Sequence, residues 1–190
     1  MCGGGSGHEP AHGGYVGRGM LTAAVAGGIF ASPPVAAVLA ALRAVCGPAG
    51  ALLIIKNYTG DRLAFGKATA QARSEGLKVE MVVAGDDCAR LDTGSKVGRR
   101  GLAGTVLIHK ICGAAAEKGA TLSEVRALAD WVQSSMGTMG AALTVCSLPR
   151  QPLSKRIGHD EMELGCANQI TMTSTYVNPI RIFTYLSSCF

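Results

Sequence analysis

The sequence lacks the motifs of several large functional classes. It has no GxxxxGK(S/T) loop and no kinase-type lysine strand motif, and it has no acidic cluster of the kind that binds two magnesium ions. No run of lysines or arginines exceeds two and the formal net charge is only +5, so nucleic-acid binding is not expected. The seven cysteines are scattered without a CxxC pair. Their spacing argues against a disulfide framework and against a metal site, and it favours reduced thiols in the cytoplasm.

A membrane protein is not predicted either. No signal peptide is visible, because Met1 and Cys2 lead straight into glycines. The uncharged span Met20–Leu42 is long enough to cross a bilayer, which needs roughly 20 apolar residues. Gly27-Gly28 and Pro33-Pro34 interrupt that span, and its residues are mostly small. We therefore predict two buried helical segments there and a protein with no membrane contact.

Small aliphatic residues are abundant. Hydrophobic residues make up 48% of the 190 positions and aromatic residues only 5%, which is enough apolar material for one globular core. The apolar runs Ala51–Ile55 and Val79–Val83 are typical of strands buried on both faces of a parallel sheet. Helical patterns alternate with them. The sequence therefore predicts an α/β fold, a parallel-sheet sandwich with crossover helices.

Local signals assign the remaining elements. The helices are predicted at Gly19 to about Ala26, Val35–Val45 with Ser32 as its cap, Leu63–Glu75, Gly104–Lys118, and from a capping box at Thr121 toward Met136. Ile111 and Trp131 are expected to face the core. Ala141–Ser147 is expected to be a strand.

The glycine-rich stretch Gly3–Gly7, followed by His8, is the first candidate for a site. Four glycines in five positions let backbone N–H groups approach a ligand with no Cβ in the way. A flexible linker is the alternative interpretation of such a run. Only two residues precede the glycines, so no strand is expected to lead into this loop.

A second polar cluster follows the apolar run that ends at Ile55. It delivers Lys56 and Asp61 at the carboxyl end of a predicted strand, where open α/β sheets place their ligand sites. Asp61 could instead cap a helix that begins near Leu63. His12 is left open between packing and substrate contact.

Four further residues have structural explanations, and two of these residues also have a functional alternative. His109 lies on an amphipathic pattern and is expected to be a buried histidine with its hydrogen bonds satisfied. His159, beside Asp160, is expected at the surface. The Arg99-Arg100 pair is interpreted either as a solvated face or as a contact to a phosphate.

Several blocks, in order and spacing, resemble the substrate-binding domain of dihydroxyacetone (glycerone) kinases. They are GGGSGHEPAHGGYVGRGMLTAAVAGGIFASP, LLIIKNYTGD, GLKVEMVVAGDD, GRRGLAGTVLIHK and EMELG, and they run from Gly3 to about Gly165. The resemblance implies a partial dihydroxyacetone-binding domain over residues 1–165 and a divergent tail over 166–190. It also implies that the chain is truncated at both ends, as an incomplete first subdomain.

The resemblance also assigns roles to individual residues. His8 is expected to donate a hydrogen bond to a substrate oxygen or to share its proton, Lys56 to hold an oxygen, and Asp61 to act as the base. Gln169 stands where the family has a histidine that forms a covalent adduct with the ketone, and an amide nitrogen cannot replace it. The residues expected to bind substrate are Gly5, Ser6, Gly7, His8, Lys56 and Asp61.

The function implied by the resemblance is phosphorylation of dihydroxyacetone or glyceraldehyde in glycerol and triose metabolism. In such kinases ATP and Mg2+ bind to a separate helical domain, or a phosphoprotein supplies the phosphoryl group, so no cofactor is expected on this chain and it is expected to be inactive alone. A parent enzyme that also cleaves FAD is a related option. The alternative is a non-catalytic variant that forms a homodimer or regulates a full-length kinase partner. A product of mis-splicing without function is the third interpretation.

Overall fold

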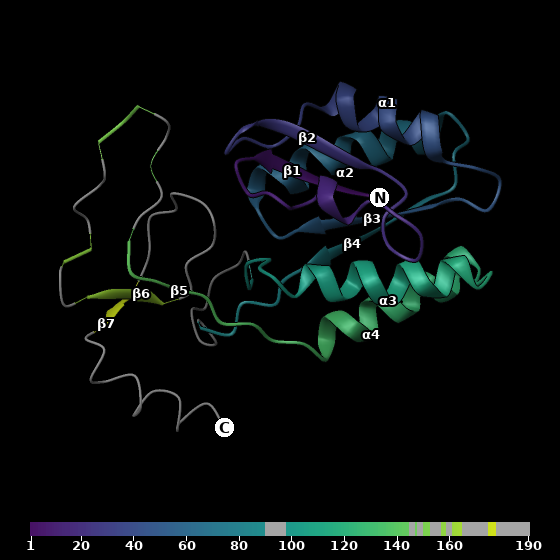
Figure 1. Cartoon of the computed structure of the whole chain (residues 1–190). Helices are drawn as coiled ribbons and strands as arrows, with labels where there is room; N and C mark the ends of the chain where they lie inside the picture. Colours follow the sequence, from purple (N-terminus) through teal and green to yellow (C-terminus); the bar gives the residue numbers. More distant parts are fainter. Residues whose placement is uncertain are drawn as a thin grey trace.

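The main sheet is parallel and lies between two pairs of helices. A computed structural model describes residues 1–89, 98–144, 147, 150–152, 157–158, 161–164 and 175–177. The strands are β1 (Cys2–Ser6), β2 (Ala24–Ile29), β3 (Ala51–Lys56) and β4 (Val79–Ala84), in the order β2-β1-β3-β4. The helices are α1 (Val35–Val45), α2 (Thr59–Ser74), α3 (Thr105–Glu117) and α4 (Leu122–Ser134). In Figure 1, α1 and α2 cover one face and α3 and α4 the other, which confirms the predicted α/β sandwich.

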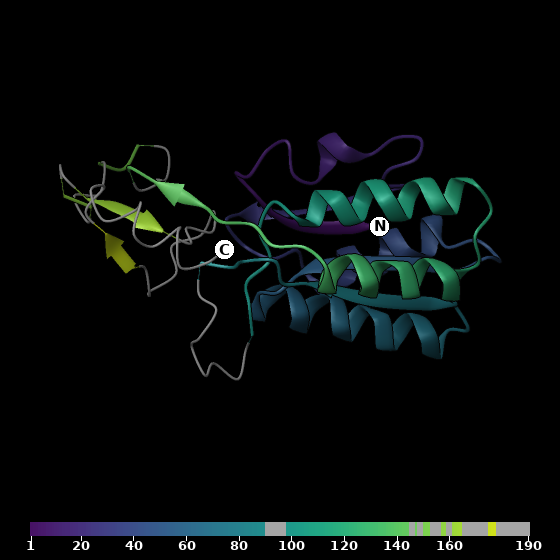
Figure 2. The same ribbon diagram turned by 90° about the horizontal axis from the view of Figure 1, so that it is seen from below.

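A second, smaller sheet lies beyond the helical layers, at the left of Figures 1 and 2. It is antiparallel and consists of β5 (Ala141–Ala142), β6 (Met162–Leu164) and β7 (Thr175–Val177). The strand predicted at 141–147 is confirmed at Ala141 and Ala142, which pair with β6, but Leu143 and Thr144 lie outside the strand, and residues 145 and 146 are not among the described residues. The positions of His159, Asp160 and Gln169 lie outside the described residues.

Most helices begin or end where local signals place them. α1 has the predicted bounds, and α4 begins at a capping box in which Thr121 Oγ1 accepts from the Glu124 N–H and the Thr121 N–H donates to the Glu124 carboxylate. α2 begins at Thr59, earlier than the predicted Leu63, and so includes Asp61 in its first turn. A carboxylate there interacts favourably with the amide N–H groups of the helix start.

The helix predicted from Gly19 to about Ala26 is wrong. Residues Ala24–Ile29 form β2 instead, in register with β1, so that Cys2 pairs with Ala24 and Gly4 with Ala26. Pairing with a neighbouring strand overrides the helix propensity of the alanines. The span 20–42 therefore holds one strand and one helix, not two helices. Among the described residues, we find no helix with the length and apolar character needed to span a bilayer.

The expectation that no strand leads into the glycine loop is also wrong, because the glycines themselves form β1. In the strand, these glycines let the backbone of neighbouring segments approach β1 closely. A Cβ on Gly3 would lie 2.5 Å from the Val25 carbonyl oxygen, and a Cβ on Gly5 would lie 2.7 Å from the Ala31 nitrogen. The chain on that side can pack against β1 only because β1 carries no side chains there.

Each face of the main sheet has its own hydrophobic core. Alternate residues of β3 point to opposite faces, with Leu53 and Ile55 toward α1 and α2, and Leu52 and Ile54 toward α3 and α4. Two predicted core positions are wrong, since Ile111 is 37% exposed and Trp131 is 64% exposed. The buried stripes of α3 and α4 lie on other faces of these helices, at Ile108, Cys112, Val125, Ala129 and Val132.

Candidate functional site

A cavity opens where the carboxyl ends of β1 and β3 meet. These strands are neighbours, but the chain leaves β1 toward β2 at one edge and leaves β3 toward β4 at the other. Such a reversal in strand order leaves a crevice in which open α/β sheets bind ligands. The cavity has a volume of about 430 Å³, and its lining includes Gly5, His8, Lys56 and Asp61.

The predicted site residues thus fall into two groups. Gly5, His8, Lys56 and Asp61 come together in the cavity, although they are far apart in the sequence. Ser6 and Gly7 are not among the lining residues. The Ser6 hydroxyl donates to the Gly27 carbonyl at 2.7 Å, and the Gly7 N–H donates to the Glu9 carboxylate at 3.0 Å. These two residues therefore hold the loop that carries His8.

Burial shifts the charged groups of the cavity toward neutrality. Desolvation lowers the pKa of Lys56, and the nearby Cys2, Asp86 and Asp61 partly offset that shift. Desolvation raises the pKa of Asp61, against the effect of a 2.5 Å hydrogen bond from the Ser32 hydroxyl and of the Lys56 charge. A carboxylate with a raised pKa is a better general base than an exposed one.

The contact with Asp61 corrects two expectations. Ser32 does not cap α1, whose N-cap is Pro34, because the Ser32 hydroxyl is directed to Asp61. Asp61 does not cap a helix near Leu63, because α2 already begins at Thr59 and has Tyr58 as its N-cap. The Asp61 carboxylate is therefore available to the cavity.

His8 is held by packing against Phe30, with ring centroids 5.1 Å apart. Burial, followed by the Lys56 charge, lowers the pKa of His8, so its imidazole is neutral at pH 7 and can either donate or accept a hydrogen bond. Gly7 precedes it with a φ of +97°, and a Cβ there would lie 2.6 Å from the Phe30 ring. Only glycine fits between the strand and this ring pair.

His12 and His109 form a buried pair on the wall of the same cavity. His12 Nδ1 and His109 Nε2 are 3.2 Å apart, and His12 also lines the cavity, so it both packs against His109 and faces the cavity. His109 is buried as predicted but only partly satisfied, since its Nδ1 has no hydrogen-bond partner among the residues that the structure describes. Burial is the main cause that lowers the pKa of His12 to about 4 and that of His109 to about 3, so both rings are neutral.

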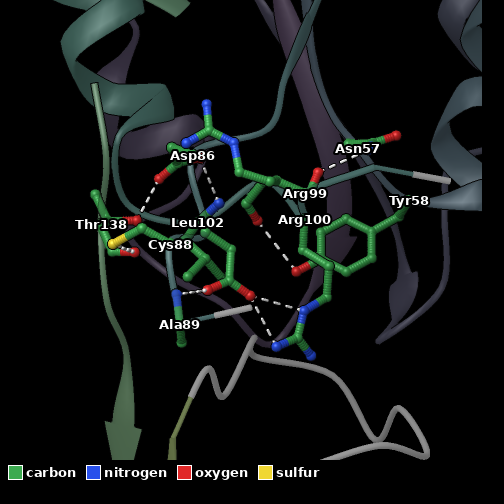
Figure 3. A network of polar contacts seen from close by, with 11 residues as sticks. Asn57, Tyr58, Asp86, Cys88, Ala89, Arg99, Arg100, Leu102 and Thr138 are labelled. Carbon is green, nitrogen blue, oxygen red and sulfur yellow. Dashed lines mark hydrogen bonds and ion pairs between the residues drawn. The ribbon is translucent and has the colours of Figure 1, made fainter. Parts of the chain in front are cut away.

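Asp86 is a structural residue of the site for which the sequence analysis assigned no role. It is fully buried just beyond β4, and its carboxylate accepts from the Leu102 N–H at 2.7 Å and from the Thr138 hydroxyl (Figure 3). The same carboxylate also accepts from the Gly104 N–H at 2.7 Å. Leu102 and Thr138 line the cavity. The signal in the sequence was an aspartate two residues after a buried strand, at the sheet edge that bears the site.

Beside it, Asp87 and Arg100 form an ion pair, with Arg100 Nη2 2.9 Å from Asp87 Oδ2 (Figure 3). The Arg99 carbonyl accepts from the Asn57 side-chain amide at 2.7 Å. The Asp87 side chain is 1% exposed and that of Arg100 is 18% exposed. Arg100 is therefore part of a partly buried network and not of a solvated face, and a contact of the arginine pair to a phosphate stays a prediction.

Comparison with known proteins identifies what this architecture resembles. A family profile described as the Dak1 domain matches residues 1–168. The human protein named triokinase/FMN cyclase is 55% identical over 167 residues, which are 87% of this chain and 29% of that protein. The chain thus spans less than a third of that relative's length.

Two solved structures extend the comparison to the fold. The crystal structure of the dihydroxyacetone kinase from Citrobacter freundii in complex with AMP-PNP and Mg2+ has a TM-score of 0.90 and 45% identity, over 99% of this chain and 35% of that one. A dihydroxyacetone kinase operon co-activator has a TM-score of 0.87 and 36% identity, over 98% of this chain and 60% of that one.

Proposed function

This chain belongs to the Dak1 domain family, and we propose on that basis that it is the dihydroxyacetone-binding part of a triose kinase. The observation that carries the proposal is the convergence of His8, Lys56 and Asp61 on one cavity at the carboxyl edge of the sheet. A three-carbon polyol ketone offers several oxygens to such a set. The cavity volume of about 430 Å³ accommodates a molecule of this size.

In this proposal each side chain has a separate task. The neutral His8 imidazole hydrogen-bonds a substrate oxygen, and the Lys56 ammonium holds an oxygen and the charge that develops on it. Asp61, whose pKa is raised by burial, takes the proton of the hydroxyl that attacks the phosphoryl group. Gly5 lines the cavity, and in this proposal its backbone N–H donates to a substrate hydroxyl.

We assign the phosphoryl donor site to another part of a longer protein or to a second chain. The 190-residue chain then binds dihydroxyacetone or glyceraldehyde without turning it over. Binding is non-covalent, because the position that holds a nucleophilic histidine in the family is Gln169 in this chain.

Calorimetry with dihydroxyacetone tests the proposal. We expect heat of binding at millimolar ligand for the unmodified chain, a loss of that heat in Lys56→Met, and no change in Lys67→Met, which removes an exposed lysine of α2. Circular dichroism checks that each variant is folded. The absence of heat with a folded unmodified chain, or equal binding by Lys56→Met, would contradict the proposed function.

The second candidate is a non-catalytic role in dimerisation with, or regulation of, a full-length kinase. The observation that favours it is the similarity to the operon co-activator. This chain covers 60% of the co-activator structure but 35% of the kinase structure. Size-exclusion chromatography of the chain mixed with a full-length kinase of the family distinguishes the two. A stoichiometric complex supports the regulatory role, and separate elution of the two proteins argues against it.

A further inference from the structure

Three metal-ligating side chains from separate segments meet beneath the face of the sheet that α3 and α4 cover. Cys2 lies in β1, His12 in the segment between β1 and β2, and His109 in α3. Each residue offers one ligand atom, and the three atoms lie within 4.8 Å of one another. The residues are 0%, 9% and 0% exposed, respectively. We call them the Cys2–His12–His109 cluster.

We propose that the Cys2–His12–His109 cluster is a zinc site, in which one thiolate and two neutral imidazoles hold a single Zn2+. The fourth position belongs to a water molecule on the side of the cavity that His12 lines. This site is distinct from the residues proposed to bind the triose, and it does not depend on that function.

The distance between the two rings fits such an ion. Zinc binds imidazole nitrogen at about 2.0 to 2.1 Å, so two nitrogens on one tetrahedral ion lie about 3.3 Å apart. His12 Nδ1 and His109 Nε2 are 3.2 Å apart. Cys2 Sγ makes only a weak contact of 3.9 Å, to the Gly3 carbonyl, and loses little by turning to a metal. The two imidazole nitrogens are thus already spaced for one ion, and Cys2 Sγ, which lies within 4.8 Å of both, turns toward it on binding.

The ligand set selects the class of metal. A thiolate and imidazoles suit borderline and soft ions such as Zn2+, whereas Mg2+ and Ca2+ prefer oxygen ligands. Binding releases the thiol proton of Cys2 to solvent and changes no oxidation state. Lys56, whose charge acts on both histidines, weakens the site, so we expect a lower affinity than that of zinc-finger peptides.

A bound ion would join three parts of the fold. It would tie β1 and α3 to the segment between β1 and β2, which also carries His8. The ion would thus hold one wall of the cavity. A direct hydrogen bond between two neutral imidazoles is the competing explanation of the 3.2 Å contact, and it predicts no affinity for zinc.

Metal titration separates these explanations. The chain is stripped with a chelator, loaded with Zn2+ and analysed for metal content by mass spectrometry, and then loaded with Co2+ for absorption spectroscopy. We expect one Zn2+ per chain, and with Co2+ a sulfur-to-metal charge-transfer band together with the visible bands of a tetrahedral ion. Cys2→Ser should lose the charge-transfer band and about tenfold or more of the affinity.

Cys112→Ser is the matched control, because Cys112 is also buried in the core on this face of the sheet but lies outside the cluster. It should keep both the metal and the spectrum. His109→Gln should lower zinc affinity while retaining the thiolate band at high Co2+. Three results would overturn the proposal: substoichiometric zinc in the unmodified chain, a Co2+ spectrum of that chain without a thiolate band, or a loss of metal affinity in Cys112→Ser as large as in Cys2→Ser. The first two results are obtained with the unmodified chain, so they do not depend on whether a variant folds.

Discussion

The two faces of the main sheet are built differently. The face under α1 and α2 is closed by apolar side chains such as Phe65, Leu42 and Leu53, all fully buried. The face under α3 and α4 buries Ile108 and Val125 but also His12 and His109, and it adjoins the cavity. One face therefore supplies stability mainly through packing, with the buried Asp61 of α2 as a polar exception beside the cavity, whereas the other gives up some of that packing for buried histidines.

This difference explains where the buried histidine pair lies. A buried polar group costs free energy unless it is hydrogen-bonded, and His109 Nδ1 has no partner among the described residues. Such a cost is tolerated where a ligand or metal can use the group, and it is avoided where only packing matters. Substitutions on the two faces should differ in kind as well as in size.

The largest effect is expected on the apolar face. Phe65→Ala should lower the free energy of unfolding by about 4 kcal/mol, because it leaves a cavity at a fully buried site between α2 and the sheet. Urea denaturation measures the change. Leu63→Ala, at a position that is 59% exposed on the same helix, should change stability by less than about 0.5 kcal/mol. A similar loss in both variants would contradict this description of the face.

Asp86→Ala should come next. It leaves the buried Leu102 and Gly104 N–H groups without their acceptor and should cost about 3 kcal/mol. Because that network holds the cavity wall, dihydroxyacetone binding should weaken as well, which calorimetry measures. Asp130→Ala, which removes an exposed carboxylate paired with Arg126, serves as the control and should cost less than about 0.5 kcal/mol. Unchanged stability in Asp86→Ala would show that the network is not structural.

Gly7→Ala should cost about 1 to 2 kcal/mol, because a side chain at φ +97° is strained and would also meet the Phe30 ring. The thermal unfolding midpoint should fall accordingly. Gly66→Ala is the opposite case, because a Cβ added at Gly66, in the middle of α2, would meet nothing within 4 Å. This substitution should raise the free energy of unfolding by up to about 1 kcal/mol. The same sign for both glycines would refute the assigned backbone requirement at Gly7.

The smallest effect is expected for His109→Leu in metal-free protein. The variant loses the contact with His12 but no longer buries an unpartnered nitrogen, and these contributions of about 1 kcal/mol each oppose one another. We expect a net change within about 1 kcal/mol, measured by denaturation in the presence of a chelator. A loss as large as that of Phe65→Ala would mean that the histidine pair is itself a main source of stability.

Much of the fold was predictable from local patterns. The continuous apolar runs at 51–55 and 79–83 identified β3 and β4, and the capping box at Thr121 identified the start of α4. Lys56 and Asp61 come at or just after the end of β3 in the sequence, so they were predicted at the carboxyl edge of the sheet. The structure brings both residues to one cavity with His8. These features depend on residues that are close in the sequence, so the periodicity of apolar residues predicts them.

Other features depended on partners distant in the sequence. The glycines of β1 were predicted to form a binding loop and not a strand, because their need for close approach by Val25 and Ala31 is a property of packing. The Cys2–His12–His109 cluster has no spacing motif, since its members come from a strand, a loop and a helix. The sequence by itself determined the layers and the polar strand ends through local periodicity. Only the tertiary structure decided which of those groups meet, because parallel pairing brings residues such as Cys2 and Ile54 side by side.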